Sequence, residues 1–330
     1  MTRMGVAALL ALGIGTSVPA TAFAQTTLRY AHVGFEGDIQ YWYAEEIAKR
    51  VNDQLGERVE INVFPAAQLG GVQETIDGVR SGAISMAHHE FSSLAQVYPE
   101  IAVLNAPFIY RDGEHAMTVT DPGSSELMQE FNDGLIEAGG MRIIGRLYRG
   151  ARQMTAKKPV YAPADLANER FRGVPIQLWT SMITGFGAIP TPVEVQELPT
   201  ALLTGMVIGQ ENPLTMINAN KLYEVQSHVM LTSHMQNVLP LFINEDVWQS
   251  LEEADREAIA TIAEEVGQET LERGLAAEND LIAELTDKGM TFITVDNGLK
   301  LDEFRESVGA QITQDFPSWE PYMARIAEVQ

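Results

Sequence analysis

Three strongly hydrogen-bonding side chains stand in a row within the stretch LTGMVIGQENP: Gln210, Glu211 and Asn212. The apolar run Met206–Gly209 before them predicts a buried strand, which Pro213 ends. An amide, a carboxylate and an amide at the end of a strand can orient and bind a small polar ligand. We expect these three side chains to form the polar end of such a site.

Two arginines supply the charge that such a site needs if the ligand is a carboxylate. Arg172 lies in the stretch ERFRGVP, and Arg170 shares its strand face because side chains two residues apart point the same way. Arg152 lies in YRGARQMT, just before the apolar Met154. The planar guanidinium forms two parallel charge-assisted bonds to a carboxylate, which lysine does not. In a chain with 45 acidic residues, surface ion pairs are the alternative role for either arginine.

A third polar group, His88-His89-Glu90, allows a metal or catalytic interpretation. Adjacent histidines on a strand point to opposite faces, whereas the zinc helix pattern places two histidines four residues apart. His32 follows another predicted strand, but nothing in the sequence fixes its distance from the pair. We therefore favour hydrogen bonding to a ligand and expect no metal and no cofactor. An exported hydrolase or lyase that uses His88, His89 or Glu90 is the alternative, although the chain lacks a Gly-x-Ser-x-Gly elbow.

The first 24 residues indicate a secretory signal peptide. Arg3 gives a basic start, Val6–Val18 is an apolar run too short to span a membrane, and a small-x-small cleavage site ends at Ala24. The chain has no cysteine, which excludes disulfides, thiolate metal sites and cysteine nucleophiles. A net charge of −23 argues against nucleic acid or an anionic membrane as a partner.

Strand and helix patterns alternate along the chain, which predicts an α/β fold. The predicted strands are Leu28–His32, Arg58–Phe64, Met141–Arg149, Glu169–Ile176, Val238–Ile243 and Met290–Val295. The predicted helices start after Asp38 and at Gly70-Gly71, run from a capping box at Ser250 to Lys288, and cover Leu299–Thr313.

A helix–turn–strand unit occurs twice, at Thr75–Glu90 and at Leu198–Asn212. Gly82 and Gly205 end the two helices, as expected for a left-handed residue at a helix C-terminus. Two such units predict two similar lobes. Because ligands bind beyond the carboxyl ends of strands in open α/β sheets, we expect the polar ends of both units to face one site.

From Leu28 to about Leu251 the chain resembles the dicarboxylate-binding (DctP-type) solute-binding proteins of tripartite ATP-independent periplasmic (TRAP) transporters. The resemblance rests on the motifs VFPAAQLGG, PADLANERFRGVP, GAIPTPVEVQELPTALLTGMVIGQENP and NKLYEVQSHVMLTSH. It implies that Arg172 grips the substrate carboxylate, that Asn212 supports it, and that Arg152 is the second arginine of the site. In such a site we expect Gln210 and Glu211 to hold Asn212 and the arginines in place. It also implies that Glu90, with His89 beside it, faces the rest of the substrate. Near Asn168 the family tends to have glycine, which puts the turn before the arginine strand in doubt.

The resemblance further implies a two-lobed periplasmic binding protein with a type II-like fold. We expect two mixed sheets flanked by helices, with the long Ser250–Lys288 helix bracing both lobes. Lobe I is expected to comprise residues 26–149 and about 238–277, and lobe II residues 150–237 and about 278–330. Such a protein is a periplasmic monomer that closes on a small organic acid and docks transiently on a TRAP permease. A sensor subunit that presents the closed form to a receptor is a further alternative.

The pocket for the rest of the ligand is expected to contain hydrogen-bonding groups only. These are His32, Glu36, His89, Glu90 and Gln177. The carboxylates among them disfavour a second carboxylate on the ligand and favour hydroxyl groups or an amine. The sequence therefore favours a sugar acid or hydroxy acid over a four-carbon dicarboxylate.

Overall fold

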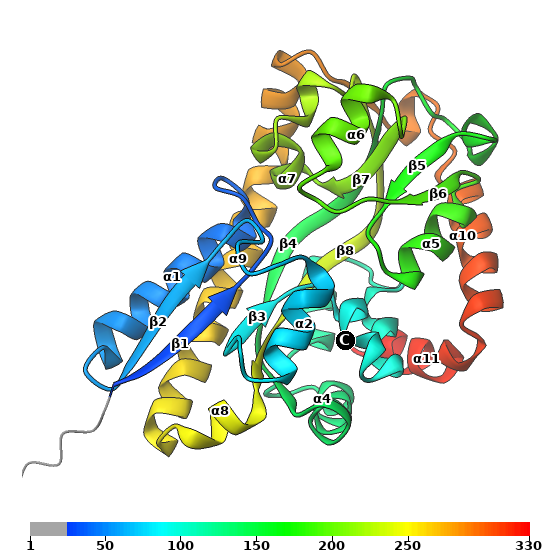
Figure 1. Cartoon of the computed structure of the whole chain (residues 1–330). Coiled ribbons are helices and arrows are strands. Elements are labelled where there is room, and N and C mark those ends of the chain that lie inside the picture. The colour runs from blue at the N-terminus through cyan, green and yellow to red at the C-terminus, as the bar shows by residue number, and fades with distance from the viewer. Residues whose placement is uncertain (1–24) are drawn as a thin grey trace, which may run out of the picture.

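The computed structural model describes residues 25–330, so the expected signal peptide lies outside the described residues (Figure 1). The strands are β1 Thr26–Ala31, β2 Val59–Phe64, β3 Met86–His88, β4 Met141–Ala156, β5 Arg170–Gly173, β6 Ile189–Pro192, β7 Gly209–Pro213, β8 His228–Asn244 and β9 Thr291–Ile293. The helices are α1 Ile39–Leu55, α2 Val72–Arg80, α3 Gly113–Val119, α4 Glu126–Gly139, α5 Gln177–Gly185, α6 Leu198–Thr204, α7 Leu214–Ala219, α8 Glu245–Ser250, α9 Glu253–Asp287, α10 Leu301–Asp315 and α11 Glu320–Glu328. Among the shorter 3-10 segments, η1 Phe91–Gln96, η2 Pro99–Asn105 and η6 Pro317–Trp319 matter below.

Two long antiparallel strands, β4 and β8, connect the two halves of the molecule (Figure 1). Strands β3, β1 and β2 continue the sheet from one end of β8, where Met86 pairs with Ile243. Strands β7, β5 and β6 continue it from the opposite end of β4, where Arg152 pairs with Pro213. The two-lobed α/β prediction is confirmed, with one refinement. The two predicted sheets share β4 and β8, so their hydrogen bonding is continuous.

Helix α9 runs along both halves, as predicted for a bracing helix (Figure 1). Ile259 and Val266 pack in the core beside α1, whereas Leu285, near its other end, packs in the core formed with α6 and α7. The predicted capping box at Ser250 was wrong. Ser250 is the last residue of α8, and its hydroxyl donates to the carbonyl of Val247 because that short helix ends there.

The strand before the Gln-Glu-Asn sequence was also misplaced. Strand β7 begins at Gly209, so all three polar residues lie inside the strand and pair with β4. Gly205 takes a positive φ of 76°, as predicted, but the bend that follows sends Val207 into the core with α6 and α7 instead of into the sheet. The turn before β5 is formed by Asn168 with a φ of 64°, a conformation that asparagine tolerates better than most residues other than glycine.

Candidate functional site

Arg152 is the centre of a buried ion network where β4, β7 and β8 meet. Its side chain is 1% exposed, and its Nε and Nη2 bind the two carboxylate oxygens of Glu211, the Nη2 bond measuring 2.8 Å. Its Nη1 donates to Glu90 at 3.0 Å and to Asn237 at 3.2 Å. Glu90 comes from the loop after β3, so this one guanidinium connects side chains of three strands and one loop.

Glu211 is held by further donors. Trp179 of α5 donates its indole N–H to Oε1 at 2.6 Å, and His234 of β8 lies 3.0 Å from Oε2. Burial alone would raise the pKa of Glu211, but Arg152 and His234 hold it well below its usual range. Burial lowers the pKa of His234, so its imidazole is neutral, and because the Glu211 carboxylate can only accept, the proton of that imidazole lies on Nε2. Nδ1 of His234 is then left to accept from the Thr232 hydroxyl. Glu211 is therefore ionised, and both of its carboxylate oxygens accept hydrogen bonds within the network.

Asn212 is oriented by the same network. Its Oδ1 accepts from Nη2 of Arg152 at 3.2 Å, and its Nδ2 donates to Gln210 at 2.5 Å. Gln210 in turn donates to Thr155 at 2.9 Å. Because an amide nitrogen carries two hydrogens, Asn212 keeps one N–H for another acceptor.

Arg172 differs from Arg152 in having free donors. Its side chain is 2% exposed, and its Nε donates to the carbonyl of Val193 at 2.8 Å. The two terminal nitrogens make no hydrogen bond to any of residues 25–330, and Arg172 forms no ion pair within that part of the chain. Burial lowers its pKa to about 10, with Glu211 opposing that shift and Arg152 adding to it, so the group stays charged at neutral pH. A buried, charged fork without a carboxylate partner suits an anionic ligand.

A cavity of about 40 Å³ lies against this fork. The residues around it include the predicted Arg152, Arg172, Asn212, His89 and Glu90, together with Arg149, Gln40, Glu194, Val33, Phe35, Val72, Val174, Val195 and Met216. Burial lowers the pKa of His89 to about 3, helped by the surrounding arginines, so this imidazole is neutral. Its Nδ1 has no hydrogen-bond partner among the described residues.

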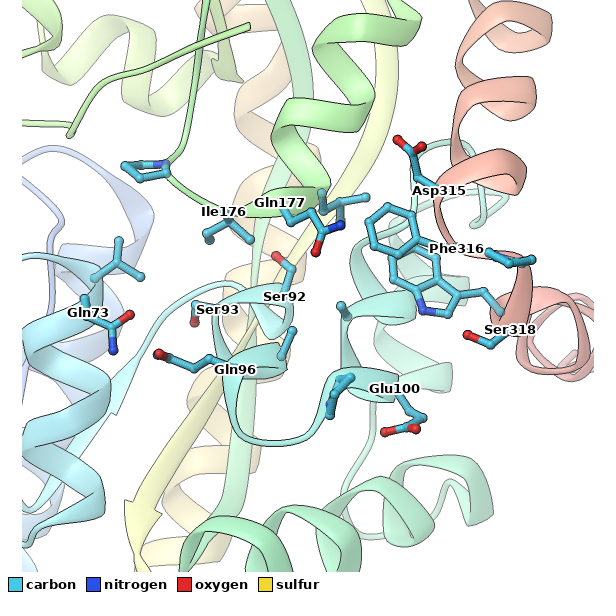
Figure 2. Close-up of a pocket in the computed structure, with 18 of the residues that line it drawn as sticks. Gln73, Ser92, Ser93, Gln96, Glu100, Ile176, Gln177, Asp315, Phe316 and Ser318 are labelled. Atoms are coloured by element: carbon cyan, nitrogen blue, oxygen red, sulfur yellow. The ribbon is translucent and has the colours of Figure 1, made fainter.

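A second, larger cavity of about 540 Å³ lies between α2, η1 and η2 on one side and α5 and η6 on the other (Figure 2). Gln177, which we expected near the ligand tail, lines this larger cavity and not the smaller one. The first turn of α5 sets its position, which the sequence alone did not fix.

Arg149 and Asp38 form a second buried ion pair beside the site. Nε and Nη2 of Arg149 bind the Asp38 carboxylate, which also caps α1 as predicted. Burial raises the pKa of Asp38, but the Arg149 guanidinium brings it below its ordinary value. Asp38 therefore pairs with Arg149, and of the three arginines that line the cavity Arg172 is the one without a carboxylate partner among the described residues.

Two residues expected in the tail pocket lie elsewhere. His32 is buried behind the site, stacked on His88 with ring centroids 4.9 Å apart, and its Nδ1 accepts from Gly34 at 3.1 Å. Glu36 is exposed in the loop before α1. Nδ1 of His88 and the Tyr30 hydroxyl are hydrogen-bonded at 2.6 Å, and His88 lies away from the cavity. Among residues 25–330, no group of three histidine or acidic side chains is placed to hold a metal ion.

Sequence reasoning missed several residues of the site. Asn237 and Trp179 hold the network together, and Arg149 lines the cavity. Arg149 lies only three residues before Arg152, which was a usable signal. Asn237 and Trp179 carried none, because their roles depend on which strands and helices pack together.

The buried histidine pair predicts a pH-dependent stability. Burial lowers the pKa of His32 to about 4 from 6.5, so the unfolded chain binds more protons than the folded chain between these values. Neutral His32 contributes fully to the free energy of unfolding above about pH 6.5, and this contribution is lost as the pH falls towards 4. Between pH 7 and pH 5, native protein should lose about 2 kcal/mol more unfolding free energy than His32→Asn.

Urea unfolding at the two pH values measures this difference. Asparagine keeps an acceptor for the Gly34 N–H and does not titrate, so it is a matched variant. Equal losses in the two proteins would contradict the prediction.

The buried Arg172 guanidinium, which has no carboxylate partner among residues 25–330, and the oriented Asn212 amide line one cavity of a two-lobed α/β fold, an arrangement that suits an anion. Residues 30–316 match the model of bacterial extracellular solute-binding protein, family 7 (DctP), and the chain belongs to this family. The resemblance inferred from the motifs is therefore confirmed. No helix within residues 25–330 combines the length and apolar character needed to cross a membrane.

Similar proteins are known in Roseobacter denitrificans. Solute-binding protein RD1_1052 is 31% identical over 299 residues, which cover 89% of this chain and 90% of the relative. Its crystal structure, with bound L-galactonate, has a TM-score of 0.84 at 27% identity, covering 93% of this chain and all of the other. A TRAP periplasmic solute-binding protein from the same organism, with bound 3-deoxy-D-manno-oct-2-ulosonic acid, has a TM-score of 0.86 at 27% identity and the same coverage.

Proposed function

We propose that this protein is a periplasmic receptor that captures a sugar acid between its two lobes and delivers it to a TRAP permease. The observation that carries the proposal is the buried Arg172 fork, whose terminal nitrogens are unpaired within residues 25–330. A ligand carboxylate would accept two bonds from this fork and compensate its charge. The N–H that Asn212 keeps free would give a third bond.

Hydroxyl groups of the ligand suit the other polar groups of the cavity. Each carboxylate oxygen of Glu90 accepts a bond, one from Arg152 and one from Asn237, and keeps lone pairs for a ligand hydroxyl. Nδ1 of His89 has no partner among the described residues. The acids bound by the two Roseobacter proteins combine a carboxylate with several hydroxyl groups, which supports the same class of ligand here.

Capture would proceed by lobe closure. With lobe I as residues 26–149 and about 238–277, His89 and Glu90 belong to lobe I, whereas Arg172 and Asn212 belong to lobe II. A ligand that contacts both pairs binds the closed form more tightly than the open form and shifts the equilibrium towards closure.

We propose that the ligand leaves unchanged and that the protein is a monomer. The family is one of solute-binding proteins, which does not support the alternative of an exported hydrolase or lyase. His88, one of the residues that alternative would use, is buried away from the cavity.

A thermal-shift screen of organic acids tests the proposed ligand class. At a concentration of about one hundred times its Kd, a ligand stabilises the native state by about 2.7 kcal/mol, which should raise the Tm by about 4 °C in a chain of this length. We expect L-galactonate or 3-deoxy-D-manno-oct-2-ulosonic acid to produce such a shift and succinate to produce none. A shift with succinate and none with any sugar acid or hydroxy acid would contradict the proposal.

A further inference from the structure

We infer that Glu194 is a specificity-determining residue that admits monocarboxylic acids with a hydroxylated tail and rejects diacids. The inference rests on the proposed function, because it assumes that Arg172 binds the first carboxylate of the ligand. It assigns a role to a side chain that makes no bond to the Arg152 network.

The position of Glu194 is the first observation. The two cavities share only two lining residues, Glu194 and Val72, so they adjoin at this pair. The smaller cavity contains the Arg172 fork, and its volume of about 40 Å³ leaves little room beyond the head group. A ligand tail too long for the smaller cavity can extend past Glu194 into the larger cavity.

The second observation is that Glu194 has no cationic partner. Within residues 25–330, no lysine, arginine or histidine nitrogen lies within 4.0 Å of its carboxylate, whereas Asp38, Glu90 and Glu211 are all ion-paired. Burial raises the pKa of Glu194, and Glu74 adds to this shift while Arg172 opposes it. The carboxylate of Glu194 therefore lies where the two cavities adjoin, without a cationic partner among the described residues.

The larger cavity extends this negative region. Glu100 and Asp315 also line it, and none of the described residues that line it is lysine, arginine or histidine (Figure 2). Its other polar side chains are neutral, namely Gln73, Ser92, Ser93, Gln96, Gln177 and Ser318. A second ligand carboxylate would meet three carboxylates and no cation here. Hydroxyl groups would meet acceptors and amides.

The N-terminus of α2 lies beside Glu194. A Cβ atom added to Gly71, the N-cap of α2, would lie 3.4 Å from Oε1 of Glu194 and 3.3 Å from Oε2 of Glu74. The helix dipole favours negative charge at this end, whereas burial and the Glu74 carboxylate raise the pKa of Glu194. Two carboxylates therefore lie at this end of α2, and a second ligand carboxylate would meet no compensating cation here.

Calorimetric titration of native protein and Glu194→Gln with L-galactonate and its diacid counterpart galactarate tests the inference. We expect native protein to bind galactarate at least about tenfold more weakly than L-galactonate. Glu194→Gln should bind galactarate at least about tenfold more tightly than native protein does, a change of about 1.4 kcal/mol. Its Kd for L-galactonate should change by less than about threefold.

Glu197→Gln is the matched control. This variant removes the same charge three residues further along the chain, but Glu197 is exposed and lines neither cavity. In this variant the ratio of the Kd for galactarate to the Kd for L-galactonate should stay within about threefold of the ratio for native protein. If Glu194→Gln also leaves that ratio unchanged while L-galactonate still binds, the role of Glu194 is wrong and the proposed function stands. If native protein binds neither these two acids nor any other sugar acid or hydroxy acid, both proposals fail.

Discussion

Replacing Arg172 by alanine is expected to weaken L-galactonate binding by about 30-fold to several thousand-fold, which corresponds to about 2–5 kcal/mol. The variant loses the buried fork whose terminal nitrogens are free, so a carboxylate entering the cavity would be desolvated without its two charge-assisted bonds. Calorimetry measures the loss directly. Stability should change little, because Arg172 makes one hydrogen bond, to a backbone carbonyl, and no ion pair within residues 25–330.

Arg170→Ala is the control for this experiment. It removes the same side chain from the same strand, but Arg170 is exposed and lines neither cavity. The affinity of Arg170→Ala for L-galactonate should stay within about threefold of that of native protein. Native-like affinity in Arg172→Ala would remove the basis of the proposed carboxylate site.

Replacing Arg152 by methionine is expected to lower the free energy of unfolding by about 3–5 kcal/mol. The guanidinium compensates two buried carboxylates, Glu211 and Glu90, and the variant leaves both without their cation. The loss should shrink at acid pH. Arg152 holds the pKa of Glu211 below the ordinary value of 4.5, so this stabilisation is present above about pH 4.5 and is lost as the pH falls.

Urea unfolding followed by tryptophan fluorescence measures this loss at neutral pH. The double variant Arg152→Met with Glu211→Gln removes one of the stranded charges and should recover part of the stability. An unchanged urea midpoint in Arg152→Met would show that the network contributes nothing to the fold. A double variant less stable than Arg152→Met would contradict the proposed cause.

Much of the fold could be predicted because it depends on local signals. Asp38 caps α1, and Gly82 and Gly205 take the left-handed conformation after α2 and α6, as the sequence indicates. The position of β7 could not be predicted in the same way. Met206–Ile208 have the composition of a strand, yet Val207 packs with α6 and α7, and only the pairing of β7 with β4 shows where the strand begins.

The candidate site, too, could be predicted only in part from the sequence. Arg172 and Asn212 stood out by residue type and motif, and the structure brings both to one cavity. The assignment of partners could not be read from the sequence. Glu211 meets Arg152 only because β7 and β4 pair in one register, with Met154 opposite Glu211. Gln177 and Glu36 had suitable side chains, but the packing of α5 and the loop before α1 place them outside the smaller cavity.

The continuity of β4 and β8 has a mechanical consequence. A protein whose halves are joined only by loops can swivel at those loops, whereas here the halves share two unbroken strands. Any opening must bend these strands. Their pairing is irregular between Tyr148 and Ala151, where Gly150 has a φ of 103°, so this stretch is one place where they can bend. Arg149 lies within the stretch and Arg152 directly follows it, and both line the smaller cavity. A bend there would displace the charged groups around the proposed ligand site.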